Sequence, residues 1–451
     1  MTGDRFVQPG PGALASVRFP AISRRTLPSG LHVWCVPHTA IPVATVTLVL
    51  PFGVRDDPAD QPGLAGVLTD LMEEGGNGLD AIAMAEALAD LGTEVSIDVG
   101  ADATTVSCSV LARCFEPAMA LLFGLMARPH LSEEDFTRVV ELRVNRLTQL
   151  KSSASAMADR LLLRGVVGDH PYGHGALGTI SSLQQMTVED VRRFHRQHVT
   201  PTGTYCVVAG SVPLDEVQAV IERHAGEWPT VPNVSRAVVL PPRPQPPRTL
   251  VTHRPGSPQS EVRVGWIGPD RSVADYHTLV TLNAMLGGQF TSRINRNLRE
   301  QRGLTYGAHS SFDFRACGGV FSCDTAVQAD ATVLAIRELI DECRAIATDR
   351  PPSADELALA KASLTRGYVR LFETSAHLAQ AAARLAMFGL PDDTFARFVP
   401  AVDAVTSDMV IDAAQRYLTV EQASIAAVGD VDQWQRELET LGRPIERVEE
   451  P

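Results

Sequence analysis

Residues 286–307, LGGQFTSRINRNLREQRGLTYG, are the most informative stretch of this 451-residue sequence. Ile294 and Leu298 are four positions apart, which predicts the buried stripe of a short helix. Arg299 falls near the carboxyl end of that helix, where a cation is favoured. Gly303 can adopt the left-handed conformation that often follows a last helical turn. On this pattern alone, the segment is an ordinary capped helix.

The same stretch resembles the C-domain signature of the inverted zincins, the metallopeptidase family of pitrilysin, insulysin and the mitochondrial processing peptidase. In that family an arginine and a tyrosine seven residues later reach into a peptidase site, and Arg299 and Tyr306 have this spacing here. The resemblance implies that Arg299 positions a substrate and that Tyr306 stabilises the oxyanion. It covers nearly the whole chain.

The resemblance also implies a zinc motif, H-x-x-E-H, in which two histidines one helical turn apart bind the metal and the glutamate activates water. The matching residues 63–76, GLAGVLTDLMEEGG, have the Gly-Leu-Ala entry of the family's helix. However, Gly66 and Asp70 occupy the two histidine positions, and Thr69 occupies the position of the glutamate. Two ligands and the general base are therefore absent.

The family's third ligand is a glutamate on a later helix, and residues 132–150, SEEDFTRVVELRVNRLTQL, match that helix. We place the ligand position near Asn145; Glu141, one turn earlier, is the nearest acid. Ser132 to Asp135 predicts a capping box at the start of the helix. The resemblance thus implies a degenerate site that binds no metal in this chain, with zinc expected in a partner subunit.

Other metal sites have weaker support in the sequence. Asp70, Glu73 and Glu74 share one helix face and could contact a hard cation, but such sites need many oxygen ligands and a shaped loop. Surface or packing roles are the expectation for the histidines that lie close to one another, His170, His174, His195 and His198.

An internal repeat indicates how the chain is organised. Residues 186–212 align without a gap on residues 405–431, at an offset of 219 residues. Both copies run from a capped helix through a short turn into an apolar strand that ends at glycine. Because strands and helices are grouped rather than evenly alternating, we predict an α+β fold with two similar domains, each an antiparallel sheet with helices packed on one face. The resemblance implies the same domain fold.

Nine prolines fall within residues 229–258, including PPRPQPP at 241–247. Such a stretch predicts an extended linker without helix or interior strand, although it could also be an SH3-type ligand. We therefore predict an N-terminal peptidase-like domain at 1–235, a linker at 236–258 and a C-terminal domain at 259–451.

Composition limits the possible partners and the compartment. A net charge of −13 argues against nucleic acid binding and suits cationic peptides. The seven cysteines include no C-x-x-C motif and predict buried side chains rather than a disulfide framework. No apolar run approaches the ~20 residues of a membrane helix, and the first residues have no apolar segment typical of a signal peptide. We predict no membrane contact and a cytoplasmic location, with the periplasm as the alternative.

Members of the resembled family build a closed chamber from four such domains, in one long chain or two half-length chains. This chain has the length of one half, has the Arg/Tyr pair and lacks the zinc motif. It therefore resembles the non-catalytic subunit of a heterodimeric zinc metalloendopeptidase, with a homologous H-x-x-E-H subunit as partner and a peptide as substrate. Residues 94–110 could offer a strand edge to that peptide.

Two alternatives stay open at this point. The chain could be a structural or peptide-binding scaffold with no role in catalysis, like the family's respiratory-complex core subunits. It could also be an independent enzyme, although it contains no G-x-S-x-G, P-loop or Cys/His signature. The Arg/Tyr pair distinguishes the catalytic partner from the scaffold, because a pure scaffold would have no chemical reason to keep it.

Overall fold

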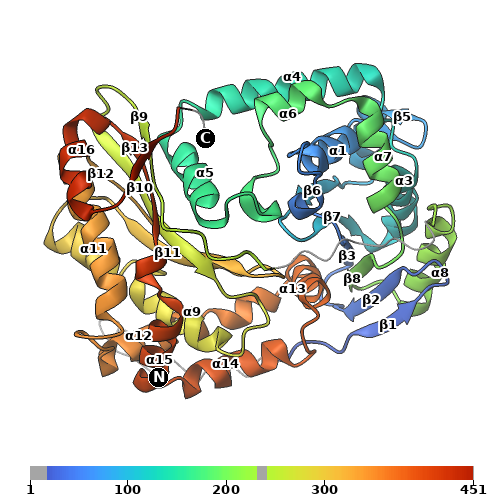
Figure 1. Ribbon diagram of the computed structural model, residues 1–451. Coiled ribbons are helices and arrows are strands. Elements are labelled where there is room, and N and C mark those ends of the chain that lie inside the picture. The colour runs from blue at the N-terminus through green and yellow to red at the C-terminus, as the bar shows by residue number, and fades with distance from the viewer. Residues whose placement is uncertain (1–17, 231–240, 450–451) are drawn as a thin grey trace, which may run out of the picture.

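The computed structural model describes residues 18–230 and 241–449. Figure 1 shows two halves, each built from a six-stranded sheet and helices packed against it. The first half lies on the right of this view and the second half on the left. The predicted α+β fold with two similar domains is confirmed.

The first sheet has the strand order β1-β2-β8-β3-β7-β6. It is mainly antiparallel, but β2 runs parallel to β8. Its strands are β1 Ser23–Thr26, β2 His32–Pro37, β3 Val43–Leu50, β6 Ser96–Val99, β7 Thr104–Leu111 and β8 Tyr205–Gly210, and a separate hairpin joins β4 Gly75–Gly76 to β5 Leu79–Asp80. The helices are α1 Leu64–Glu73, α2 Ala81–Asp90, α3 Phe115–Ala127, α4 Glu133–Leu150, α5 Ala154–Val167, α6 Ile180–Gln185, α7 Val188–His198 and α8 Leu214–Ala225, with 3₁₀ turns η1 Val54–Asp56, η2 Ala112–Cys114 and η3 Pro171–Gly173.

The second sheet has the order β11-β12-β10-β13-β9-β14, with β9 parallel to both β13 and β14. Its strands are β9 Thr249–His253, β10 Gln259–Gly268, β11 Ala308–Asp313, β12 Gly319–Gln328, β13 Ser424–Gly429 and β14 Ile445–Arg447. The helices are α9 Tyr276–Leu286, α10 Arg293–Asn295, the π-helical η4 Arg296–Gln301, α11 Thr332–Ala345, α12 Ala354–Thr365, α13 Ser375–Phe388, α14 Thr394–Ala404, α15 Ser407–Tyr417 and α16 Val431–Leu438. Short 3₁₀ turns are η5 Ala329–Ala331, η6 Tyr368–Phe372, η7 Val420–Gln422 and η8 Glu439–Leu441.

The two halves repeat one topology. The order β2-β8-β3-β7-β6 in the first sheet corresponds to β9-β13-β10-β12-β11 in the second, with the same parallel and antiparallel pairings. Helices α7 and α15, and strands β8 and β13, lie at equivalent positions of the aligned segments. Thr187 and Thr406 cap these helices by accepting hydrogen bonds from backbone N–H groups of the first turn. The internal duplication predicted from the sequence therefore extends to the capping residues of these two helices.

One helix of each half packs on the sheet of the other half. Helix α5 belongs to the first half, but its Leu161 and Leu162 pack on β9, β10 and β13 of the second sheet. Helix α13 belongs to the second half, but its Leu378 and Ala382 pack on β3 and β8 of the first sheet. Each sheet is consequently covered on both faces, its own helices lying on one face and the exchanged helix on the other.

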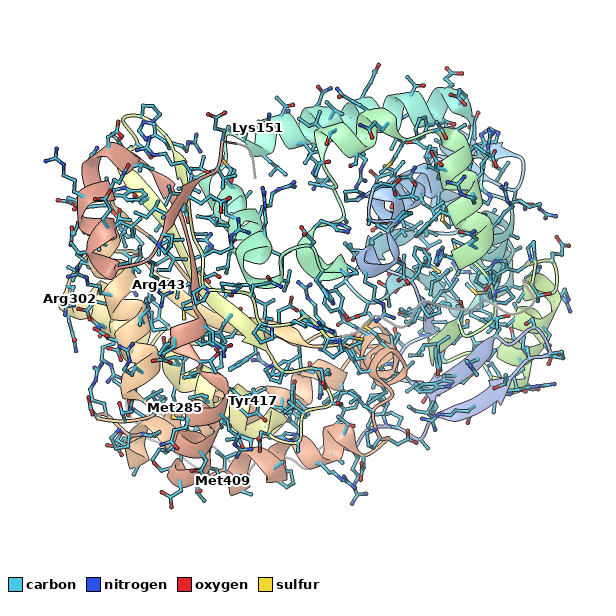
Figure 2. All side chains as sticks on the ribbon, in the orientation of Figure 1. Lys151, Met285, Arg302, Met409, Tyr417 and Arg443 are labelled. Carbon is cyan, nitrogen blue, oxygen red and sulfur yellow. The ribbon has the colours of Figure 1, made fainter. Side chains whose placement is uncertain are left out.

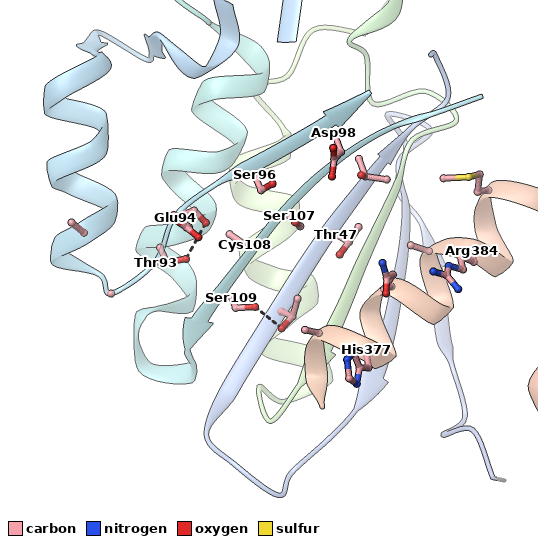
Figure 3. A pocket seen from close by; sticks show the side chains of 18 residues that line it. Thr47, Thr93, Glu94, Ser96, Asp98, Ser107, Cys108, Ser109, His377 and Arg384 are labelled. Carbon is pink, nitrogen blue, oxygen red and sulfur yellow. Dashed lines mark hydrogen bonds between the residues drawn. The ribbon is translucent and has the colours of Figure 1, made fainter. Parts of the chain in front are cut away.

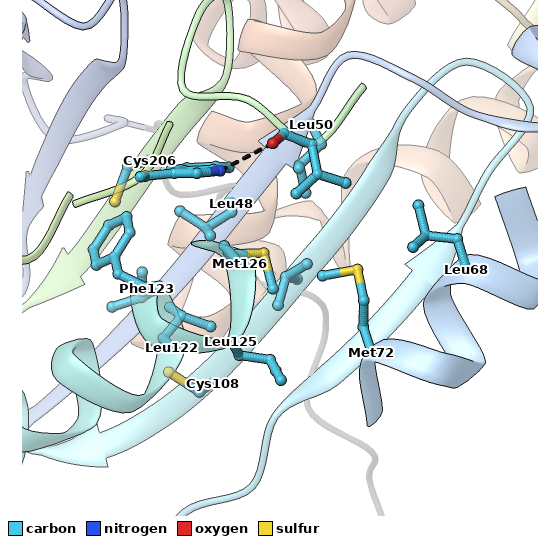
Figure 4. Close-up of a cluster of buried hydrophobic side chains, with 14 of the residues drawn as sticks. Leu48, Leu50, Leu68, Met72, Cys108, Leu122, Phe123, Leu125, Met126 and Cys206 are labelled. Atoms are coloured by element: carbon cyan, nitrogen blue, oxygen red, sulfur yellow. Dashed lines mark hydrogen bonds between the residues drawn. The ribbon is translucent and has the colours of Figure 1, made fainter. Parts of the chain in front are cut away.

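The main core of the first half lies between its sheet and helices α1 and α3. Figure 4 shows Leu48 of β3 and Phe123 of α3 in this core, together with Leu68 and Met72 of α1. The core holds the face of α1 that carries Leu64, Leu68 and Leu71 in a fixed orientation.

The predicted linker is only partly extended chain. Residues 236–240 lie outside the described part of the structure, and residues 241–248 have no helix or strand. Residues 249–253, however, form β9, which pairs with β13 and β14 inside the second sheet. The prediction that the linker contains no interior strand is therefore wrong. The short segment TLVTH has no proline and is rich in residues that favour strands, although prolines flank it on both sides.

The seven cysteines are free thiols, and Cys35, Cys108 and Cys206 are buried in the first core as predicted. Burial raises the pKa of Cys35 and Cys108 to about 12, so their reactive thiolate forms are suppressed. Within residues 18–230 and 241–449, no helix is long and apolar enough to cross a membrane.

Candidate functional site

The Arg/Tyr segment begins with α10 and continues into the π-helical turn η4. Ile294 and Leu298 are buried, and Gly303 has a φ of 65°, as the sequence predicts. The wide turn is an addition to the prediction: the Arg302 N–H donates to the carbonyl of Asn297, five residues earlier. π-Turns of this kind are frequent at functional sites.

Asn297 explains the wide turn. Its side-chain amide donates to Glu338 at 2.8 Å and to Glu342 at 2.7 Å, and both acceptors belong to α11. The side-chain oxygen Oδ1 of Asn297 accepts from Arg302 Nε at 2.8 Å, and Arg302 also pairs with Glu338 at 2.5 Å. The donors of Arg302 are therefore used inside the chain.

Arg299 is differently placed. Its guanidinium carbon lies 4.1 Å from the centre of the Phe290 ring, which is itself 61% exposed. Its Nη1 is buried and has no hydrogen-bond partner in the described part of the chain. Arg299 thus packs on an aromatic ring and keeps one donor that no described residue uses.

Tyr306 is 93% exposed, although its neighbour Thr305 is held firmly. The Thr305 hydroxyl donates to the carbonyl of Gly307 at 2.8 Å and accepts from Thr325 at 3.1 Å. Among the described residues, no hydrogen bond or ring contact joins Tyr306 to Arg299 or to any other side chain. The backbone is anchored while the phenol projects outward.

The degenerate zinc positions lie on α1, in the other half. Figure 2 shows Arg302, a neighbour of Arg299, at the outer side of the second half, far across the view from α1. The chain therefore does not bring its Arg/Tyr segment to its own degenerate positions.

The start of α1 is fixed by a buried carboxylate. Asp57 accepts hydrogen bonds from the N–H groups of Gly63 and Ala65, each at 2.7 Å. Burial raises the pKa of Asp57 to about 7 in spite of these donors. Asp57 serves as a cap and is not free to act as a ligand.

The side chains of α1 that occupy the motif positions are engaged locally. Gly66 has no side chain, and the Thr69 hydroxyl donates to the carbonyl of Gly66 at 3.0 Å. Asp70 accepts from Nη1 of Arg143 on α4. Arg143 Nη2 also donates to the carbonyl of Ala176.

Asn145, near which the sequence places the third ligand, is exposed on α4. Arg143, two residues earlier on the same helix, is the residue that bonds to Asp70 of α1. It lies in the buried stripe with Val139 and Leu147, at intervals of four residues, which is the signal that could have identified it.

These residues do not fit a zinc ion. A zinc site in a protein needs three or four nitrogen, sulfur or carboxylate ligands arranged around one point. Here the donor set is one carboxylate, Asp70, already paired with the cationic Arg143, and one hydroxyl, Thr69, bonded to backbone. The hard-cation alternative is no better placed, because Glu74 pairs with Arg138 at 3.1 Å.

The predicted packing roles of two histidines are visible. His195 bonds through Nε2 to the carbonyl of Met126 at 3.0 Å, and burial lowers its pKa to about 4. His170 accepts from the N–H of Tyr172 at 3.1 Å.

One group that sequence reasoning missed is His253 with Asp430 and Asp432, whose ligand atoms lie within 4.8 Å of one another. The Nδ1 atom of His253 accepts from the N–H of Val431 at 3.1 Å, and Asp430 accepts from Gly256 at 3.1 Å. These bonds join β9 to the start of α16. His253 is far in sequence from the two aspartates, so no local motif spacing reveals the group.

A groove of about 860 Å³ lies on the first half between α13 and the sheet edge formed by β6. Figure 3 shows hydroxyls on the sheet side, including Thr47, Ser96 and Ser107, and His377 and Arg384 on α13. Among the described residues, β6 pairs with β7 alone, so its other edge has no strand partner. The strand edge expected within residues 94–110 is therefore β6, while β7 lies inside the sheet.

Two family models match the chain: Insulinase (Peptidase family M16) over residues 35–179, and Peptidase M16 inactive domain over residues 185–364. An uncharacterized zinc protease of Mycobacterium leprae is 27% identical over 369 residues, which cover 80% of this chain and 81% of that protein. An uncharacterized zinc protease of Streptomyces coelicolor is 25% identical over 313 residues, 67% of each chain.

Solved structures share the architecture. The peptidase M16 inactive domain from Pseudomonas fluorescens has a TM-score of 0.82 at 22% identity, covering 90% of this chain and 98% of that one. A protease from Helicobacter pylori has a TM-score of 0.85 at 19% identity, covering 91% and 99%. These structures show that the fold is shared, and the two domain models, which belong to one family, confirm the family resemblance. The chain belongs to peptidase family M16, the insulinase family.

Proposed function

We propose that this chain is the non-catalytic subunit of a heterodimeric zinc metalloendopeptidase. The observation that carries the proposal is the contrast between its two sites. Arg299 and Tyr306 have donors that no described residue uses, whereas Asp70, at a motif position on α1, is paired with Arg143. The partner subunit would supply an intact H-x-x-E-H site with its zinc.

The physical role of the pair follows from the charge that develops in peptide hydrolysis. Attack on the scissile carbonyl builds negative charge on its oxygen, and a hydrogen bond aimed at that oxygen strengthens in the transition state. The outward phenol of Tyr306 can donate such a bond in a partner's site. The rigid guanidinium of Arg299, held by Phe290, suits the carbonyl groups or a carboxylate of the peptide.

The groove beside β6 supports contact with an extended peptide. An open strand edge provides backbone donors and acceptors, and neighbouring pockets receive alternate side chains. The groove walls carry carboxylates at Glu94 and Asp98 and cationic or hydroxyl groups elsewhere, so polar peptides suit it best.

The second candidate is a scaffold subunit with no part in catalysis. It is favoured by the Asp70–Arg143 pair. In this pair, the residue at a motif position stabilises the fold and takes no part in catalysis. The two candidates differ in one respect: only a catalytic partner needs the outward groups of Arg299 and Tyr306.

Co-expression with a similar-length homologue that carries H-x-x-E-H tests the proposal. We expect the two chains to elute together in size-exclusion chromatography and to cleave peptides together. This chain alone should hold no zinc after dialysis and show no peptidase activity. Separate elution at every salt concentration, or one tightly held zinc per isolated chain, would contradict the proposal.

In that complex, Arg299→Ala should raise KM about tenfold or more while kcat changes less, because the side chain positions the peptide rather than the reacting atoms. Steady-state kinetics with one peptide measures both constants. Arg302→Ala is the matched control, since it removes an arginine of the same turn that pairs with Glu338. It should leave KM unchanged, and thermal melting of both variants checks that the turn is intact. Equal effects of the two substitutions would favour the scaffold.

A further inference from the structure

The guanidinium of Arg143 lies between three parts of the first half. It donates to Asp70 of α1 and to the carbonyl of Ala176 in the loop before α6, while its own backbone belongs to α4. The Arg143 side chain is only 6% exposed, against 45% for Asp70. A buried cation thus faces two positions, 66 and 70, at which the family's motif has metal ligands.

Gly66 is necessary for this arrangement. A Cβ atom at position 66 would overlap both the carbonyl oxygen of Ala176 and Nη2 of Arg143. The loop and the guanidinium can therefore approach α1 only because residue 66 has no side chain.

Further contacts hold the same loop down. Gly178 lies so close to Pro62 and Gly63 that a Cβ atom on it would meet their backbone. Arg160 donates to the carbonyl of Gly178 at 3.0 Å, and Ser182 donates to the carbonyl of Pro62 at 2.7 Å. The loop at 174–178 therefore packs closely against the start of α1.

We propose that Arg143 has taken over the place of the metal: its guanidinium cross-links α1, α4 and the loop at 174–178, and it excludes a divalent cation from positions 66 and 70. The chemistry suits this substitution. A planar guanidinium carries a permanent positive charge and binds a carboxylate and a carbonyl at fixed angles. Because this charge is buried, solvent and salt screen it poorly, and a second cation beside it is repelled.

Zinc binding is therefore blocked by Arg143 as well as by the lost ligands. The test restores the motif with Gly66→His, Thr69→Glu and Asp70→His in three chains: one with Arg143 present, one with Arg143→Glu, which also supplies a third carboxylate ligand, and one with Arg143→Gln, which removes the charge without adding a carboxylate. Each purified chain is incubated with zinc chloride, dialysed and analysed for metal. We expect zinc near one ion per chain with Arg143→Glu, a smaller but measurable zinc content with Arg143→Gln, and no zinc with Arg143 present.

Arg146→Glu in the restored chain is the matched control. Arg146 is exposed on the same helix, so this change alters the net charge equally without touching α1, and the chain should stay free of zinc. Stoichiometric zinc in the restored chain that still has Arg143 would overturn the proposal. So would a folded Arg143→Glu variant that takes up no more zinc than the Arg146→Glu control.

A second measurement does not depend on the restored motif. In the otherwise natural chain, Arg143→Met removes the charge and its donors but leaves an apolar side chain of similar length. Amides of the loop at 174–178, such as that of Gly178, which bonds to Gly175 at 3.0 Å, should then exchange with solvent about tenfold faster or more. Exchange at the natural rate, equal to that of an Arg146→Met control, would overturn the cross-linking role.

Discussion

Tyr306→Phe in the complex with a zinc-bearing partner should lower kcat by about 10²–10³-fold. The substitution removes one hydroxyl donor and leaves the ring, and the loss falls on the chemical step because the hydrogen bond is strongest in the transition state. The phenol is 93% exposed and its backbone is anchored by Thr305, so neither folding nor assembly should change. Single-turnover kinetics with a fluorogenic peptide measures the step directly.

Tyr205→Phe is the control for this prediction. Tyr205 is half-buried in the first sheet, where its ring stacks on His32 at a centroid distance of 4.6 Å, far from the Arg/Tyr segment in the sequence and in a different half. It should leave kcat unchanged. If Tyr306→Phe also leaves kcat unchanged in a complex that assembles and is active, this chain does not stabilise the oxyanion.

The second large effect concerns stability. Leu161→Ala should lower the free energy of unfolding by about 3 kcal/mol, within the range of 2–5 kcal/mol typical of a buried leucine. Leu161 is fully buried on α5, and the cavity would open against the second sheet although α5 belongs to the first half. Urea titration followed by tryptophan fluorescence measures the loss.

Both halves contain tryptophans, Trp34 and Trp228 in the first and Trp266 and Trp434 in the second, so the fluorescence reports on both. The exchanged helices predict one cooperative transition rather than two. Leu359→Ala, at a position of α12 where the leucine is 46% exposed, should change stability by less than about 0.5 kcal/mol. A similarly small effect of Leu161→Ala would mean that α5 contributes little to the second core.

Local and repeated features of the fold could be predicted from the sequence. Ser132 starts α4 by accepting from the N–H of Asp135 at 3.0 Å, as the capping box indicates, and the aligned segments correctly predicted the capped helices α7 and α15 and the strands that follow them. Helix exchange could not be predicted in the same way. The apolar stripes of α5 and α13 show that these helices are buried, but a stripe does not identify the sheet that covers it.

Only part of the candidate site could be named from the sequence. The family resemblance points to Arg299 and Tyr306 within one segment, whereas the π-turn depends on acceptors contributed by α11, which begins about thirty residues later. Arg143 belongs to no motif in the sequence, and the resemblance points instead to a position near Asn145, two residues later. The role of Arg143 depends on a carbonyl of a loop, Ala176, that no side-chain pattern records.

The exchange of α5 and α13 also has a consequence for the order of events during synthesis. When the ribosome has completed the first sheet, the apolar face that carries Val36, Val49 and Val207 is still bare, because α13 is encoded more than 160 residues after the last strand of that sheet. Contacts this distant in sequence form late and slow the approach to the native state. Exposed apolar surface on a nascent chain favours aggregation. The newly made first half therefore exposes an aggregation-prone apolar face until the carboxyl-terminal helices emerge.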